Sequence, residues 1–152
     1  MQFGLSPQVH AFDTASMIEN LPSLAMMVSQ AIGMAQGAPL HVSPVCFDSE
    51  FTSSRIDLRN NSSFQACWFL QSIRYLAGTT VVSFFDLDAE ESFLNLPVPM
   101  SSPFCRMLVQ LKKFEPVYIL ESGDNGETLS LENAVGETLE IIFPSQYIPI
   151  PL

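Results

Sequence analysis

Basic residues are few in this sequence. Lysine and arginine together number 6, against 16 aspartate and glutamate residues, and the formal net charge is −10. All the cations lie between Arg55 and Lys113, so both ends of the chain carry acids only. Nucleic-acid binding depends on cationic side chains that neutralise phosphates, so we expect no nucleic-acid partner. A basic protein partner would suit the acidic ends.

Cysteine is also rare. The chain has 3 cysteines, Cys46, Cys67 and Cys105, and no CxxC pair. The N-terminus lacks the basic segment with which a secretory signal begins, which predicts a cytoplasmic protein. In that compartment the thiols should be reduced and mostly buried, without a disulfide framework.

Apolar runs are too short for a membrane span. Residues 20–47 carry no charged side chain, but Pro22 and Pro39 limit the uninterrupted helix to residues 23–38. A span needs about 20 apolar residues, so none is expected. Charged residues make up only 14% of the chain and apolar ones 47%. This balance favours a sizeable core, or apolar surface kept for a partner.

Recognisable catalytic motifs are missing too, since the chain contains no GxGxxG, P-loop, GxSxG or HExxH sequence. His41 and Cys46 could in principle act as base and thiol nucleophile. Their odd separation puts them on opposite faces of a regular strand, unless Pro44 breaks the alternation. A structural Cys46 and a solvent-facing His41 are the favoured interpretation.

The segment DLDAEE (residues 86–91) offers a second candidate. Asp86, Asp88 and Glu90 could present oxygen ligands to a divalent cation. The segment does not fit an EF-hand loop, because Glu91 stands where glycine is needed, and no histidine lies nearby. A solvated loop is the favoured interpretation. We therefore expect no metal, no cofactor and no catalytic activity.

The periodic patterns that are present predict three helices, at residues 13–36, 64–78 and 102–114. Strands are expected at residues 40–47, 55–58, 79–87, 116–122, 128–132 and 138–144. The first two should form a hairpin and the last three a meander. The sequence thus predicts one α+β domain over residues 1–152, in which about three helices pack mainly on one face of an antiparallel β-sheet. The element order is similar to that of GAF, PAS and profilin-like domains, and residues 1–12 should be loose.

The first predicted helix has more apolar surface than one stripe requires. Met26, Met27 and Met34 lie off the stripe of apolar residues that faces the core. Methionine adapts to varied partners because its side chain is flexible and polarizable. This surplus predicts a homodimer or an obligate complex.

The stretch PLHVSPVCFDSEF (residues 39–51) follows this helix and resembles a known family. Residues 20–51 are similar to the helix and crossover loop of the SecB export-chaperone family, whose pattern there is P-L-x-L-x-P-V-N-F-D-x-x-[YF]. Cys46 stands where that family has asparagine. The resemblance implies a groove that holds partly unfolded proteins, formed near Leu40, Val42, Pro44 and Phe47.

These observations favour a non-catalytic protein-binding module, which would be a small acidic adaptor or an export-type chaperone. Its predicted protein-binding residues are Met26, Met27, Met34, Leu40, Val42, Pro44 and Phe47. The alternative is a small-molecule sensor of the GAF/PAS type, or an enzyme without a recognisable motif.

Overall fold

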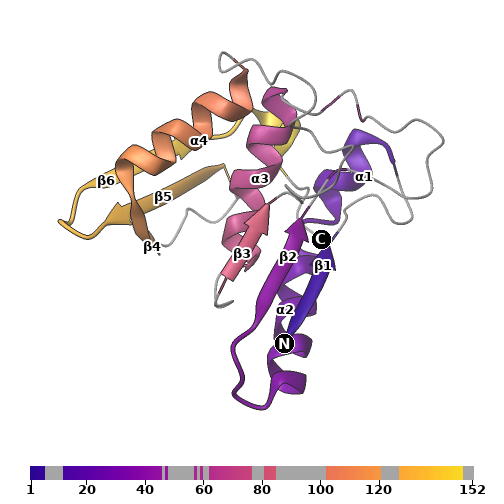
Figure 1. The fold of residues 1–152 in the computed structure, drawn as a ribbon. Coiled ribbons are helices and arrows are strands. Elements are labelled where there is room, and N and C mark those ends of the chain that lie inside the picture. Colours follow the sequence, from indigo (N-terminus) through magenta and orange to yellow (C-terminus); the bar gives the residue numbers. More distant parts are fainter. Residues whose placement is uncertain are drawn as a thin grey trace, which may run out of the picture.

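The computed structural model describes residues 1–5, 12–45, 47, 57, 59, 62–76, 81–84, 102–120 and 127–148. Within them the chain forms helices and two small sheets (Figure 1). The helices are α1 (Thr14–Glu19), α2 (Ser23–Ala35), α3 (Ser63–Leu76), α4 (Pro103–Phe114) and the short 3-10 helix η2 (Ser145–Tyr147). The strands are β1 (Gln2–Leu5), β2 (His41–Val45), β3 (Val81–Phe84), β4 (Pro116–Leu120), β5 (Thr128–Asn133) and β6 (Thr138–Ile142). The predicted α+β class is confirmed.

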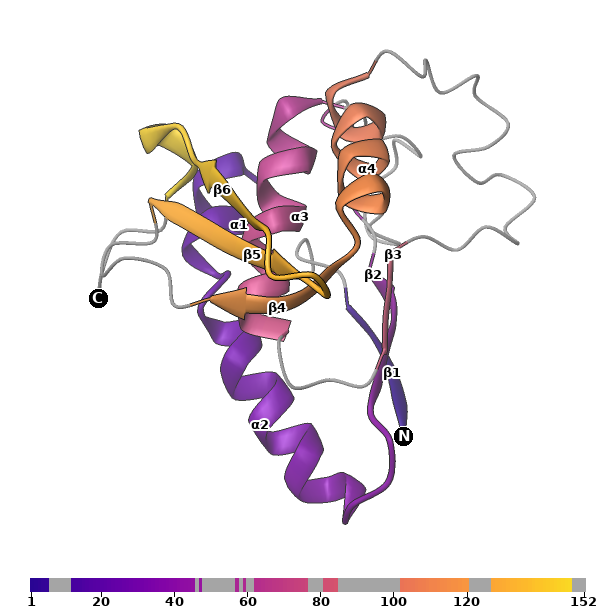
Figure 2. The same ribbon diagram turned by 90° about the vertical axis from the view of Figure 1, so that its left-hand side faces the viewer.

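The first sheet is parallel and follows the chain order β1-β2-β3. Phe3 of β1 pairs with Val42 of β2, which in turn pairs with Val82 of β3. Helices α1 and α2 connect β1 to β2, and α3 connects β2 to β3. Both α2 and α3 lie on one face of this sheet (Figure 2). The first part of the chain therefore consists of two consecutive strand–helix–strand units.

This sheet departs from the predicted antiparallel arrangement. Residues 2–5, expected in a loose N-terminal segment, form β1, and the N-terminal amine of Met1 donates a hydrogen bond to the Pro39 carbonyl (2.7 Å). Strand β2 pairs with β1 and β3 rather than with residues 55–58, of which the structure describes Asp57 alone, outside any strand. A helix between two strands returns the chain to the same edge of the sheet, so the strands run parallel.

A β-bulge interrupts β2 at its proline. The register passes from Phe3–Val42 to Leu5–Val45, so β2 contains one residue more than β1 over this interval. Proline has no N–H to donate to a ladder and is tolerated where a bulge has already broken it. Because of the extra residue, Val42 and Val45 both reach the buried core despite their odd separation. Pro44 thus lies in the interval where the regular alternation along β2 is broken.

The second sheet is the predicted antiparallel meander, with strand order β4-β5-β6. Leu129 and Leu131 of β5 are fully buried, and the residues that alternate with them, Thr128, Ser130 and Glu132, are half-buried. Asn133 closes the turn into β6, because its side-chain oxygen accepts hydrogen bonds from the backbone N–H groups of Val135 and Glu137. The alternating burial along β5 is therefore that of a sheet with one covered face.

The single helix predicted over residues 13–36 is two helices. Asp13 caps α1, since its carboxylate accepts from the backbone N–H of Ser16 (2.9 Å) and from the Ser16 hydroxyl (2.7 Å). These two hydrogen bonds, the backbone one first, lower the pKa of Asp13. The chain turns at residues 20–22 and α2 starts after Pro22, because proline cannot continue the helical hydrogen bonds of the turn before it.

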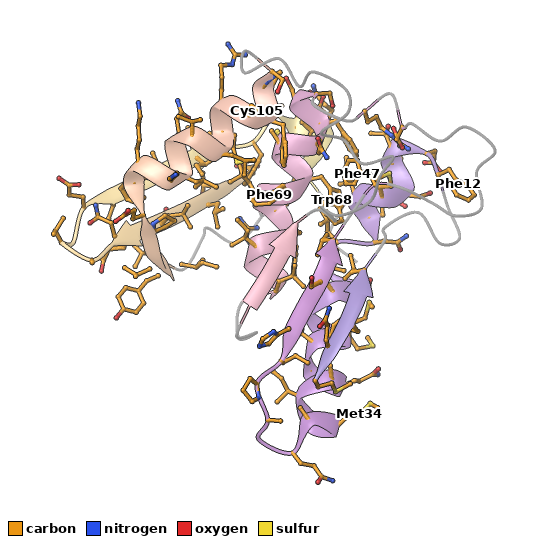
Figure 3. All side chains as sticks on the ribbon, viewed as in Figure 1. Phe12, Met34, Phe47, Trp68, Phe69 and Cys105 are labelled. Carbon is orange, nitrogen blue, oxygen red and sulfur yellow. The ribbon has the colours of Figure 1, made fainter. Side chains whose placement is uncertain are left out.

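Helix α3 joins the two halves of the core. Phe64, Trp68 and Leu76 face the parallel sheet, α1 and α2. Ala66, Phe69 and Leu70 instead pack with α4 and the antiparallel sheet. Figure 3 shows Trp68 close to Phe47, and their rings are 5.1 Å apart in an edge-on contact. A helix between two layers must be apolar on both sides, which explains the dense aromatic composition of residues 64–76.

We expect Trp68→Phe to lower the free energy of unfolding by about 1–3 kcal/mol. The buried Trp68 indole N–H donates to the carbonyl of Met17 (3.1 Å) in α1, and phenylalanine leaves that carbonyl without this donor. Urea denaturation measures the effect. Tyr118→Phe on β4 is the control, because Tyr118 is largely exposed. Equal unfolding midpoints for both variants would contradict the role given to Trp68.

Candidate active site

The connections of the parallel sheet differ in length between its two ends. The carboxyl ends of β1, β2 and β3 are followed by the longer connections, residues 6–13, 46–62 and 85–102. The amino ends of β2 and β3 are preceded by shorter ones, residues 36–40 and 77–80. The carboxyl ends of parallel strands lie at the same edge of a sheet. In folds built from strand–helix units, the loops at that edge carry the functional residues. The candidate site is therefore the carboxyl edge of β1-β2-β3.

Carboxylates are concentrated in these long connections. Asp48 and Glu50 follow the end of β2 at Val45, and Asp86 and Asp88 follow the end of β3 at Phe84. These side chains lie outside the described residues.

The described part of this edge contains a clamp made by Arg59. Its guanidinium holds the Asp57 carboxylate in a bidentate pair, with Nε to Oδ1 at 2.9 Å and NH2 to Oδ2 at 2.6 Å. NH1 also donates to the Thr14 hydroxyl in the first turn of α1 (3.4 Å), and the guanidinium lies 5.6 Å from the Phe64 ring centroid. The clamp ties the connection after β2 to the helix that follows β1.

We expect Arg59→Ala to lower the free energy of unfolding by about 1.5–3 kcal/mol, a typical loss for hydrogen bonds to a charged group. Arg59 and Asp57 retain only 22% and 11% side-chain exposure, so the variant leaves a half-buried carboxylate without its bidentate partner. Thermal unfolding measures the loss. Arg106→Ala on α4 is the control, because Arg106 is exposed. Arg59→Lys should recover only part of the loss, because an ammonium cannot form the bidentate pair; full recovery would contradict the clamp.

The described cysteines do not form a nucleophilic site. Cys67 on α3 and Cys105 on α4 are free thiols and half-buried. Burial raises the pKa of the Cys67 thiol, which disfavours the reactive thiolate at neutral pH. His41 is half-buried at the start of β2, which is the amino edge of the sheet and away from the candidate site. Cys46 lies outside the described residues.

The predicted protein-binding residues do not share one surface. Met26, Met27 and Met34 are exposed on α2, and Figure 3 shows Met34 near the carboxyl end of that helix. Leu40, Val42 and Phe47 are buried in the core between the parallel sheet and its helices. Pro44 lies at the bulge of β2. The structure thus separates the methionines from the residues of the PLHVSPVCF stretch.

The candidate metal ligands Asp86, Asp88 and Glu90 all lie outside the residues that the structure describes. The described residues contain no group of three or more His, Cys, Asp and Glu side chains placed to hold a metal ion. None of the helices found there is long and apolar enough to cross a membrane.

Parallel strands joined by helices, with long connections at their carboxyl ends, are the arrangement of the β/α class of enzymes. Residues 1–96 match the family described as "D-apionate lactonase, TIM barrel domain". The match covers more than half of the chain, and the chain therefore belongs to this family. Neither a curated protein nor a solved structure gives a significant match.

The family match corrects the functional predictions. The resemblance of residues 20–51 to SecB is wrong, and so is the prediction of a non-catalytic adaptor or chaperone. The prediction that the protein is not an enzyme is also wrong, and the alternative of an enzyme without a recognisable motif fits better. The physical reason lies in β2. Leu40 and Val42 alternate because both side chains enter the core, and Pro44 lies at the bulge of β2. The residues that resemble a chaperone groove therefore belong to the core of a strand–helix unit.

The parallel unit itself was missed at the level of sequence, although a signal for it exists. Helical patterns at residues 13–36 and 64–78 alternate with strand patterns at 40–47 and 79–87. Strands that alternate with helices of this length are typical of parallel sheets.

Proposed function

We propose that this chain forms part of the active site of an enzyme that hydrolyses a sugar-acid lactone, with the lactone of D-apionate as its first candidate substrate. The observation that carries the proposal is the family match over residues 1–96, which spans β1, β2 and β3. The parallel order of these strands supports it, because it provides a carboxyl edge with long connections.

The chemistry of lactone hydrolysis suits two carboxyl groups. A lactone is a cyclic ester: a water oxygen attacks its carbonyl carbon, the bond from that carbon to the ring oxygen breaks, and a hydroxy acid results. One carboxylate takes the proton of the attacking water, and one carboxylic acid gives a proton to the departing ring oxygen. The reaction consumes one water and requires no oxidant or reductant.

We assign these roles to one acid after β2 and one acid after β3, with Asp48 and Asp86 as the first pair to test. Both follow closely on the ends of neighbouring strands. Glu50 and Asp88 lie further along the same connections and are the next candidates. The clamp of Arg59 with Asp57 supports the arrangement, because it anchors the connection after β2 to α1.

The test is hydrolysis of D-apionate lactone near neutral pH, where spontaneous ring opening by hydroxide is slow. The purified chain is assayed alone and together with the remaining strand–helix units of a lactonase of the same family. Release of acid above the uncatalysed rate in either sample, absent with a simple open-chain ester of similar size, supports the proposal. No catalysis in both samples, although a stable complex has formed in the second, overturns it.

A further inference from the structure

Helix α2 carries a group of exposed methionines. Met26, Met27 and Met34 keep 65%, 42% and 70% of their surface exposed, whereas the buried residues of α2 lie on another side of the helix. Gln30 and Gly33 are also exposed, and helical spacing places all five residues on one side of α2. We call these five residues the methionine face. Contiguous exposed apolar surface of this kind marks an interaction site.

Gly33 lies on this face and is not required by the packing of the described chain. A Cβ atom added there meets no described heavy atom within 4 Å. The position is inside α2, and glycine is the least favourable residue there apart from proline. Glycine does, however, allow a second backbone to approach closely. Gly33 therefore indicates a close contact that the described chain does not itself make.

The charge of the molecule decides which partner suits the methionine face. The formal net charge is −10, and a second copy of the chain carries the same charge. Two copies repel each other over charged surface, but residues 20–47 have no charged side chain and can approach their equivalents freely. A basic partner would find no carboxylate there. Membrane-surface helices carry lysine or arginine on their polar side, and α2 has neither. A second copy of this chain is thus the occupant that fits.

The methionine face is also complementary to itself. In an antiparallel pair of α2 helices with the two-fold axis at Gln30, Met27 lies beside Met34 of the second copy. Met26 lies beside Gly33 of the second copy, so that a large side chain enters the space left by a small residue. Each of these pairs is within one residue, or about 1.5 Å, of the same level along the helix. The two Gln30 side chains meet at the axis, where the amide N–H of one donates to the carbonyl oxygen of the other.

We propose that the methionine face is a dimer interface, in which two copies of this chain pack their α2 helices against each other in antiparallel orientation. The amino end of each helix then lies beside the carboxyl end of the other, and these ends carry opposite partial charges. A contact through one helix of 13 residues, about 20 Å long, buries less area than a standard stable interface. The dimer is therefore reversible, with a dissociation constant in the micromolar range, and each copy keeps its own core. The inference does not rest on the proposed lactone hydrolysis.

The test is sedimentation velocity of the full chain at concentrations from about 1 µM to about 0.2 mM, where wild type should form a reversible dimer. Gly33→Arg should raise the dissociation constant at least about tenfold, because its side chain fills the space that Met26 enters. This variant has open space for its side chain and should stay folded. It also lowers the net negative charge, so stronger repulsion would not explain a loss of dimer. Gln110→Arg makes the same change in charge at an exposed position of α4 and should dimerise like wild type.

Salt dependence gives a second readout of the same interface. Salt screens the repulsion between two acidic copies, and no ion pair crosses the methionine face. The dissociation constant of wild type should therefore fall when NaCl is raised from about 0.05 M to about 0.5 M. A dimer held by ion pairs, such as those between the cations of α4 and the acids of a second copy, would weaken instead.

Circular dichroism of Gly33→Arg, and of Met26→Arg as a second variant, establishes which of them is folded, and a folded one decides the mutational test. A wild-type chain that stays monomeric at about 0.2 mM would overturn the inference. A folded variant that dimerises like wild type, or a wild-type dimer that salt weakens, would overturn it as well. Flotation of the wild-type chain with phosphatidylcholine vesicles, in place of dimer formation, would assign the face to a lipid surface and reject the dimer.

Discussion

Replacement of Asp86 by asparagine should reduce the rate of lactone hydrolysis by about 100- to 10,000-fold, the range that a positioned acid or base contributes. Asparagine has nearly the same size but cannot take or give a proton. Asp86 comes two residues after β3, the strand that pairs with β2, and Asp48→Asn should therefore cause a loss of the same order if the two acids share one substrate. Steady-state rates on D-apionate lactone, in the sample that shows catalysis, measure both.

The matched control for this prediction is Glu140→Gln. Glu140 is an exposed acid on β6, in the antiparallel sheet beyond residues 1–96. The Glu140→Gln variant makes the same change from acid to amide away from the candidate site, so the activity of this variant should equal that of wild type. Thermal unfolding of all variants separates lost chemistry from lost structure. Full activity in both Asp48→Asn and Asp86→Asn would contradict the assignment of these acids and turn attention to Glu50 and Asp88.

Val42→Asp should unfold the chain. The Val42 side chain is fully buried, with 0% exposure, in the cluster formed by the parallel sheet, α1, α2 and α3. An aspartate there either buries a charge without a partner or must be protonated, and either route costs several kcal/mol. This is a large share of the 5–15 kcal/mol by which domains are stable. Loss of the circular dichroism signal at room temperature is the expected result.

Met34→Asp is the control for the buried charge. Met34 lies on α2 and is 70% exposed, so the same negative charge stays hydrated and the melting temperature should change by no more than a few degrees. A folded Val42→Asp variant would mean that Val42 faces solvent, as the chaperone-groove interpretation of residues 39–51 requires. The two variants thus distinguish a core strand from a docking surface.

The candidate site could be predicted from sequence only in pieces. The acids after residue 84 stand out because a carboxylate run directly follows a strand pattern, yet on their own they fit a solvated loop as well as a site. The proposed pairing of Asp48 with Asp86 depends on β2 and β3 being neighbours. Pairing between strands that are distant in the chain leaves no local signal in either strand. The family match shows only that the chain belongs to the lactonase family, not which acids act.

The sequence by itself determined the helices and strands that are long enough to show a clear periodic pattern. The patterns at residues 64–78 and 102–114 predicted α3 and α4, and the strand patterns at residues 116–122, 128–132 and 138–144 predicted the meander of β4, β5 and β6. Local preferences decide these features, because caps, turns and apolar periodicity act within a few residues. The α+β class follows from their order.

Only the tertiary structure decided whether β2 is a core strand or a docking surface. The residues Leu40, Val42 and Phe47 are apolar in any interpretation, and whether they face a partner or a core depends on which segments pack against them. Strand β1 is too short to be recognised by its own pattern, and yet it sets the edge of the parallel sheet. The direction of pairing comes from the helices that return the chain to the same edge, a property of the whole strand–helix unit that no single stretch contains.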